Sequence, residues 1–158
     1  MLAVAITYEG QRELRGVSVS LSEAEVHWRQ FLQLLMERGM HGLTMVISDA
    51  HTGLRKALET CFPGMPWQRC QFHLQQNVMS HVPKPSMRAE IAADIRSVLN
   101  TPDRQEADRL LKIRIEKYRA SAPDLANWLA ENVPQSLTVF QVPAAHRRML
   151  RTTNMLER

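Results

Sequence analysis

The chain has 158 residues, which is enough for one hydrophobic core and too few for two domains of ordinary size. Hydrophobic residues make up 44% and charged residues 23%, which argues against a disordered chain, and no apolar run approaches the roughly 20 residues that span a bilayer. The net charge of +4 permits a nucleic-acid partner without requiring one. The chain has only two cysteines and its first residues do not form a basic, apolar leader, which favours a reduced cytoplasmic protein over a secreted one.

The N-terminal residues predict a hairpin followed by a helix. Leu2–Tyr8 and Leu14–Val19 are short apolar runs on either side of a turn signal, as in two antiparallel strands. Ser22 precedes Glu25 by three residues, the spacing of a capping box. We therefore expect Ser22 to cap a helix that ends at Gly39.

The next segment predicts a buried strand with an acid at its end. Leu43–Ile47 is nearly continuous in apolar and β-branched residues, which is typical of a central strand buried on both faces. Asp49 follows it, and a helix is expected over residues 53–62. A turn rich in proline then leads to a short strand within Trp67–Phe72.

From residue 73 onward the pattern is helical. Four helices are predicted, at Leu74–His81, Pro85–Asn100, Arg104–Ser121 and Asp124–Asn132. The chain therefore divides into a mixed segment of residues 1–72, a helical segment of residues 73–143 and a basic segment of residues 144–158. The last of these contains Arg147, Arg148, Arg151 and Arg158 against the single acid Glu157.

Asp49 is the most informative candidate for chemistry. It lies at the carboxyl end of a predicted central strand, where open α/β sheets place ligands and catalytic groups. A carboxylate there offers the hard oxygen ligand that Mg²⁺ prefers. Aspartate before a helix is also a common N-cap, and local evidence alone favours that structural role.

Cys70 and His73 lie three residues apart, the spacing of half a zinc site. A second pair with that spacing is absent, and nothing in the sequence orients a nucleophilic Cys–His pair, so a buried cysteine beside a satisfied histidine is the favoured local interpretation. The C-terminal arginines fit either phosphate contacts or a solvated basic face. By default Glu157 is a residue on the surface of a helix.

Taken together, these segments resemble the Mutator-type bacterial transposases, the insertion-sequence 256 group. The resemblance covers essentially the whole chain in the family's order, and the combination of its motifs is highly specific. The matching stretches are GVSVS (16–20) with SEAEVHWRQFL (22–32), SDAHTGL (48–54), FPGMPWQRCQFHLQQN (62–77), VPK (82–84) and HRRMLRTTNMLER (146–158).

The resemblance implies an RNase H-like α/β catalytic core interrupted by an all-helical insertion. It implies a three-acid Asp-Asp-Glu site that uses Mg²⁺ or Mn²⁺ to transfer transposon ends, with DNA and further copies of the protein as partners. The resemblance places the family's second aspartate on Asp49 and its glutamate on Glu157. The family signature near the site falls on His51, Cys70 and His73, and the basic segment supplies Arg147, Arg148 and Arg151 for DNA phosphates.

The family's first aspartate belongs to a strand before Leu2–Tyr8, and no acid precedes Glu9. We therefore expect an internal fragment with an incomplete core, in which the metal is bound only in the intact protein. Whether this chain is an enzyme stays open, and we expect the isolated chain not to cleave or join DNA. The alternatives are a catalytically dead remnant that binds DNA or the transposase, another RNase H-like nuclease, and an unrelated helical protein.

Overall fold

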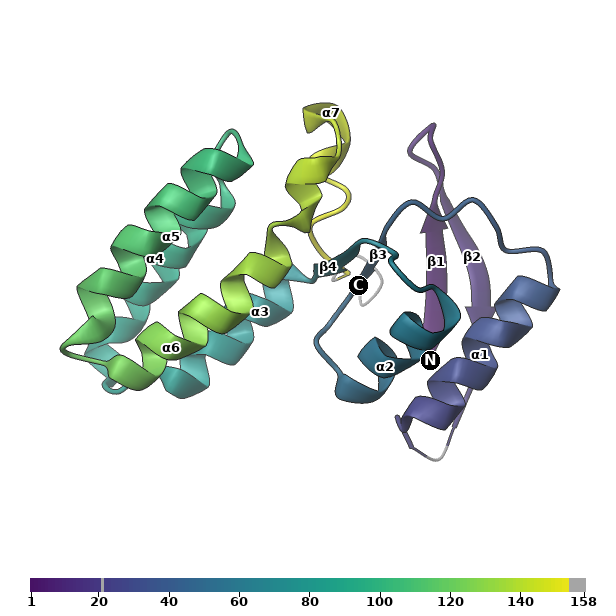
Figure 1. The fold of residues 1–158 in the computed structure, drawn as a ribbon, viewed down its shortest axis with the longest axis horizontal. Helices are drawn as coiled ribbons and strands as arrows, with labels where there is room; N and C mark the ends of the chain where they lie inside the picture. The colour runs from purple at the N-terminus through teal and green to yellow at the C-terminus, as the bar shows by residue number, and fades with distance from the viewer. Residues whose placement is uncertain (21, 154–158) are drawn as a thin grey trace. The chain divides into compact units, whose positions relative to one another are not determined.

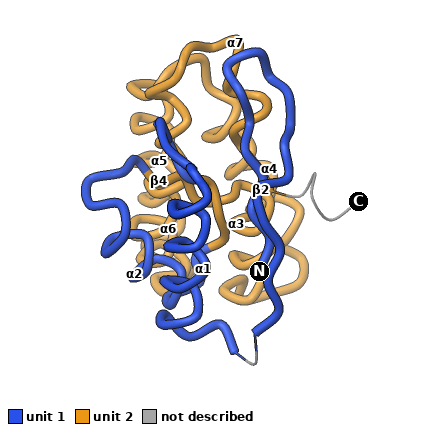
Figure 2. Tube along the Cα trace, turned by 90° about the vertical axis from the view of Figure 1, so that its right-hand side faces the viewer, with its two compact units in different colours: residues 1–46, 50–66 blue, residues 47–49, 67–158 orange. Residues whose placement is uncertain are grey.

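The computed structural model describes residues 1–20 and 22–153, and in it the chain forms two compact units (Figure 2). Unit 1 contains residues 1–46 and 50–66, and unit 2 contains residues 47–49 and the chain from residue 67 onward. The strands β1 and β2 belong to unit 1, and the long helices α4 to α6 belong to unit 2 (Figure 1). The domain boundaries after residues 72 and 143 stay predictions.

Unit 1 begins with the antiparallel hairpin that the sequence predicts. Strands β1 (Leu2–Ile6) and β2 (Arg12–Val17) pair from Leu2 opposite Val17 to Ile6 opposite Arg12, with a bulge between Ala3 and Val4. The turn includes Gly10, whose φ of 80° lies in the left-handed region that glycine adopts without strain. The predicted hairpin is confirmed.

The hairpin packs on α1 (Glu25–Glu37) through Gly16, where a Cβ atom would come within 2.7 Å of Leu35. Helix α1 in turn packs on α2 (Thr52–Cys61). The presence of α2 confirms the helix expected over residues 53–62. The two helices supply the core of unit 1, which consists of Phe31, Leu32 and Leu35 from α1 and Leu54, Ala57 and Leu58 from α2.

The predicted capping box at the start of α1 is wrong. The N-cap residue is Ala24, and no side chain caps the helix. The hydroxyl of Ser22 lies 3.1 Å from Nδ1 of His27 instead, and that of Ser20 lies 3.0 Å from the same nitrogen. The Ser22 hydroxyl therefore contacts the imidazole of His27. It does not cap the helix, although the local sequence pattern predicts that role. At the other end, Gly39 follows α1 with a φ of 90°, as predicted for its stop.

The predicted central strand is also wrong. Strand β3 (Val46–Ser48) has only three residues, and within the described ranges its one neighbour is β4 (Trp67–Arg69). Ile47 is half-buried, and Thr44 is exposed before the strand begins. An apolar run interrupted by a solvated threonine does not continue as a strand buried on both faces. β4 is likewise shorter than predicted, because a helix begins at Gln71.

Unit 2 is mainly helical, and its four predicted helices are confirmed. They correspond to α3 (Gln71–Asn77) with η1 (Val78–His81), η2 (Pro85–Met87) with α4 (Arg88–Leu99), α5 (Arg104–Arg119) and α6 (Pro123–Asn132). Shorter turns follow at η3 (Val133–Ser136), η4 (Thr138–Gln141) and α7 (Ala144–Arg147). No helix in the described part of the chain is long and apolar enough to cross a membrane.

One apolar core joins these helices. Its buried residues include Leu74, Val78, Ile91, Ile95, Val98, Leu111, Leu125, Leu129 and Leu137, which come from α3 to α6 and from the turns that follow α3 and α6. The start of α5 is capped by Asp103, whose carboxylate accepts the backbone N–H of Glu106 at 2.9 Å. This core is the frame to which the end of β4 and the C-terminal segment attach.

Candidate functional site

The carboxyl ends of β3 and β4 lie side by side in unit 2. The backbone N–H of Cys70, just after β4, donates to the carbonyl oxygen of Ser48 at 2.7 Å. The Ser48 hydroxyl accepts the indole N–H of Trp67 at 2.8 Å. Asp49 follows β3 directly and is exposed. The structure therefore puts Asp49 and Cys70, two predicted site residues, after neighbouring strands.

The C-terminal segment returns to this place across more than 80 residues of sequence. The sulfur of Cys70 lies 3.4 Å from Oγ1 of Thr152 and accepts the backbone N–H of Thr153 at 3.4 Å. The N–H of Gln71 donates to the carbonyl oxygen of Arg151 at 2.9 Å. Two motifs that are distant in sequence, one around Cys70 and one around Thr152, are thus parts of one site.

Cys70 is fully buried, yet its thiol is acidic. Burial raises the pKa of the thiol, but the N–H of His73, the hydroxyls of Thr152 and Thr153 and the N–H of Thr153 favour the thiolate and lower the pKa to about 7. The sulfur is therefore partly anionic at neutral pH.

This lowered pKa predicts a stability that depends on pH. The folded-state pKa of Cys70, about 7, lies below its usual 9.0, so the thiolate stabilises the fold fully above pH 9, and this contribution is lost as the pH falls through 7. We expect the difference in unfolding free energy between wild type and Cys70→Ala to grow from pH 7 to pH 9. Urea unfolding in reducing buffer measures this difference.

Cys61→Ala is the matched control for this titration. Burial raises the pKa of the Cys61 thiol, and its neighbour Arg29 only partly offsets the effect. The Cys61 contribution therefore cannot grow over the same range of pH. Parallel stability curves for wild type and Cys70→Ala from pH 7 to pH 9 would contradict the assignment of a stabilising thiolate to Cys70.

Arg69 is a buried residue of this site that was not among the predicted site residues. Its guanidinium donates to Oδ1 of Asn132 at 2.5 Å and lies 5.5 Å from the ring centroid of Trp128, while only 4% of the residue is exposed. Burial lowers the pKa of Arg69, and nearby Asp49 and Cys70 raise it. Arg69 thus places a positive charge next to the two candidate residues. Its place in the stretch FPGMPWQRCQFHLQQN (62–77), directly before Cys70, was the signal that could have found it.

Two glutamines fasten this region to the helical core. Gln68 and Gln71 both donate to the carbonyl oxygen of Ser136, at 2.8 and 2.9 Å. Gln68 also accepts the N–H of Val139 at 2.7 Å. All of these groups are buried, so the end of β4 is held rigidly by satisfied polar contacts.

The two histidines of the family signature are not brought together with Cys70 into a metal site. His51 belongs to unit 1, where its Nε2 lies 3.2 Å from a carboxylate oxygen of Glu23. His73 lies on α3 of unit 2, half-buried against the ring of Phe72. In residues 1–20 and 22–153, no three His, Cys, Asp or Glu side chains are grouped as metal ligands.

The three predicted DNA-binding arginines have different surroundings. Arg147 donates to the carbonyl oxygens of Pro102 and Val142, at 2.6 and 3.0 Å. Arg151 donates to Oδ1 of Asn100 at 2.9 Å, and burial lowers its pKa. Arg148 is exposed. The first two arginines hold the C-terminal segment against the helices, whereas Arg148 is directed to solvent.

Asp49 is the type of ligand that Mg²⁺ requires, and it is accessible at the end of a strand. Glu157, the other predicted ligand, lies outside the described residues. A two-metal centre needs several carboxylates, and the described residues supply one at this place. They therefore do not complete a metal site by themselves, and no chemical step through a metal follows from their geometry.

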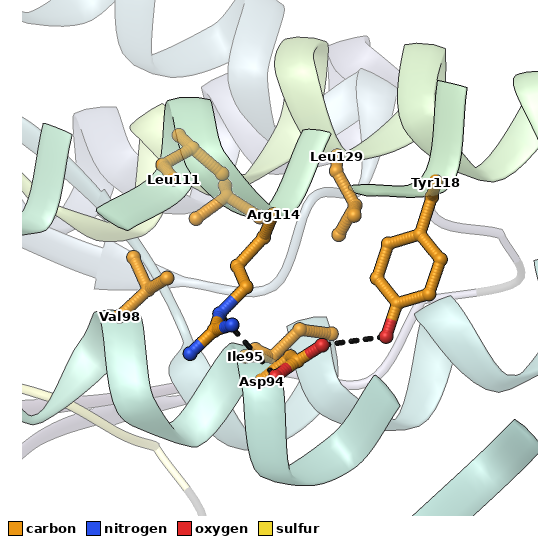
Figure 3. Close-up of a pocket in the computed structure, with 8 residues that line it drawn as sticks. Asp94, Ile95, Val98, Leu111, Arg114, Tyr118 and Leu129 are labelled. Carbon is orange, nitrogen blue, oxygen red and sulfur yellow. Dashed lines mark hydrogen bonds and ion pairs between the residues drawn. The ribbon is translucent and has the colours of Figure 1, made fainter. Parts of the chain in front are cut away.

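Unit 2 also has a small hollow between α4, α5 and α6 (Figure 3). Asp94 lies in its wall and accepts the phenol of Tyr118 at 2.6 Å and the ammonium of Lys117 at 2.6 Å, and it lies 3.3 Å from Arg114. Leu111 and Leu129 are among the apolar residues that line it. Because the charged side chains around this hollow are paired with one another, we assign them a role in stabilising the packing of the helices.

Comparison with known proteins matches residues 1–158 to the family described as "Transposase, Mutator family". The chain is 48% identical to the transposase for insertion sequence element IS406 of Burkholderia multivorans. The matched region covers all of the chain and 41% of that protein. It is 34% identical to the ISRM5 transposase of Rhizobium meliloti (100% of the chain, 39% of the relative) and 31% identical to the IS256 transposase in Tn4001 of Staphylococcus aureus (99% and 40%). The chain spans about two fifths of the length of these relatives.

Proposed function

This chain belongs to the Mutator family of transposases, as its resemblance to the insertion-sequence 256 group indicated, and we propose that the protein moves an insertion sequence by metal-dependent phosphoryl transfer at DNA ends. The observation that carries the proposal is the convergence on one place of Asp49 and the segment that leads to Glu157. Cys70 contacts both Ser48, which precedes Asp49, and Thr153. This convergence is what a site shared by two distant acids requires.

We also propose an RNase H-like core with a helical insertion. The order of elements supports it, because a hairpin, a helix, a strand that ends at an acid, a second helix and a second strand follow one another. The chain then leaves β4, forms the helices of unit 2 and returns at Arg151 to bond with Gln71. A segment that leaves and returns at one point is what an insertion predicts.

In this proposal Asp49 and Glu157 hold Mg²⁺ or Mn²⁺, together with groups that the described residues do not supply. When bound, the metal would activate the attacking hydroxyl and neutralise charge on the leaving oxygen. The residues of the chain keep the acids in place, since small displacements in such a site cost large factors in rate. Cys70 and Arg69 are two buried residues that would support Asp49.

DNA at the element's ends is the proposed substrate. Arg148 is exposed in the basic segment and is the arginine best placed to contact phosphates. Arg147 and Arg151 already bond to the protein, so we assign them to the placement of this segment. An element has two ends to be processed, so self-association of the whole protein is part of the proposal.

Excision of a marker flanked by the element's ends tests this function. It is measured in cells that express the protein carrying this chain, as wild type, Asp49→Asn or Asp108→Asn. Asp49→Asn removes a ligand charge, and we expect excision to fall by at least about 100-fold, the upper range for groups one step removed from a metal. Asp108 pairs with Arg104 on α5, and Asp108→Asn is expected to keep excision near the wild-type rate.

Each result of this assay decides something. Excision that survives Asp49→Asn would overturn the assignment of Asp49 as a ligand. A wild-type protein that gives no excision but still binds end DNA would favour the alternative, a catalytically dead remnant. Because Asp49 is exposed, Asp49→Asn should leave the fold intact, which circular dichroism can verify.

A further inference from the structure

The segment Arg151–Thr153 is attached to the start of α3 by a few specific contacts. One is a backbone bond, from the N–H of Gln71 to the carbonyl oxygen of Arg151 at 2.9 Å. The other two meet at one atom, the sulfur of Cys70, which accepts the N–H of Thr153 and contacts the hydroxyl of Thr152, each at 3.4 Å. The sulfur is thus the point on which this segment converges.

We propose that Cys70 is a positioning residue whose sulfur holds Arg151–Thr153 at the end of β4, beside the strand that carries Asp49. The inference rests on the proposed function, in which Asp49 and Glu157 act together. Thr153 lies four residues before Glu157, so fixing Thr153 limits where a glutamate on this stretch can reach. Cys70 itself touches neither substrate nor metal in this scheme.

The same residue is tied to β3 through its backbone. The N–H of Cys70 donates to the carbonyl oxygen of Ser48 at 2.7 Å, one residue before Asp49. The backbone of Cys70 therefore fixes one acid-bearing segment while its side chain fixes the other. Cys70 thus contacts two segments that are about 100 residues apart in sequence.

Burial makes the sulfur hard to replace by water. Cys70 has no exposed surface, and Arg69, Gln71 and Leu74 next to it on β4 and α3 are buried as well. Without the sulfur, the N–H of the half-buried Thr153 loses its acceptor. The bond between Gln71 and Arg151 and the contact of Arg151 with Asn100 would remain, but the end of the segment at Thr153 would open more often.

Amide hydrogen exchange measured by NMR on the full chain tests the proposal. In Cys70→Ala we expect the amides of Thr153 and Gln71 to exchange roughly tenfold faster, the effect of one lost hydrogen bond. Cys70→Ser keeps a side-chain acceptor and should restore part of the protection. Cys61→Ala, which removes the other thiol from a helix of unit 1, should leave both amides unchanged.

The outcomes separate positioning from general stability. Unchanged exchange at Thr153 in Cys70→Ala would overturn the proposal. If Cys70→Ala instead loosens all of unit 2, Thr152→Val decides, because it removes only the hydroxyl at the sulfur and keeps the shape of the side chain. Faster exchange at Thr153, with the amides of α5 unchanged, supports the proposal, and equal protection contradicts it.

The excision assay connects this local effect to the reaction. We expect Cys70→Ala to lower excision about 10- to 100-fold, as for supports of metal ligands, with partial rescue by Cys70→Ser. Loss of excision in Asp49→Asn together with wild-type exchange at Thr153 in Cys70→Ala would reject the positioning role and keep the function. Faster exchange together with full excision in Asp49→Asn would reject the function and keep the anchoring contact.

Discussion

Replacing Asp94 with alanine is expected to lower the free energy of unfolding by about 3 kcal/mol, the lower part of the range for breaking a buried ion pair. Asp94 is 8% exposed and lies on α4, where it binds three groups of α5. Lys117 and Tyr118 donate to it at 2.6 Å each, and Arg114 lies 3.3 Å away. Without the carboxylate, a buried phenol and a half-buried guanidinium lose their partner.

The carboxylate is held in its charged form by these groups. Burial raises the pKa of Asp94, but the hydrogen bonds from Lys117 and Tyr118 and the charge of Arg114 lower it below its usual value. Asp94 also changes the pKa of its partner Tyr118, since burial and the hydrogen bond to Asp94 raise the pKa of Tyr118 to about 12. The charge on Asp94 therefore stabilises the fold above its unfolded-state pKa, and this stabilisation is lost as the pH falls through its folded-state pKa.

Denaturant unfolding of Asp94→Ala and Asp94→Asn measures the effect. The asparagine keeps the shape and one acceptor, so we expect a smaller loss than for alanine. Glu116→Ala is the control on α5, because it removes an exposed pair with Arg119 and should change stability little. If Asp94→Ala unfolds at the wild-type denaturant concentration near neutral pH, the network is not stabilising. The difference should shrink in acid for the reason given above.

The helices of unit 2 were predictable because local signals there agree with the tertiary structure. Prolines separate the predicted helices, and in the structure Asp103 caps the start of α5. Where another side chain competes for the capping group, the local signal fails. Ser22 has the spacing of a capping residue, but the imidazole of His27 binds its hydroxyl, and the helix begins without a side-chain cap.

The candidate site was predictable only in its separate parts. A strand followed by Asp49 is visible in the sequence, and so are the motifs that contain Cys70 and Thr152. Their meeting is not visible, because the contact between Cys70 and Thr152 joins residues 82 positions apart. The burial of Arg69 under Trp128 depends in the same way on how β4 meets α6. Residue identity alone cannot supply such long-range geometry.

Gly53→Ala is expected to destabilise unit 1 by about 2 to 3 kcal/mol, the upper range for overpacking. A Cβ atom at residue 53 would lie 2.4 Å from the carbonyl oxygen of Glu23 and 3.0 Å from the backbone nitrogen of Glu25. Both obstacles are backbone atoms, which cannot rotate away as a side chain could. The glycine of the SDAHTGL motif therefore allows the start of α2 to approach the start of α1.

The close approach of the two helix starts also explains the contact between His51 and Glu23. His51 is the residue before α2, and its Nε2 lies 3.2 Å from a carboxylate oxygen of Glu23. Thermal or urea unfolding of Gly53→Ala checks the prediction, with Lys56→Ala on the exposed side of α2 expected to change stability by less than about 0.5 kcal/mol. If Gly53→Ala were as stable as wild type, α1 and α2 would have to be farther apart than in this structure.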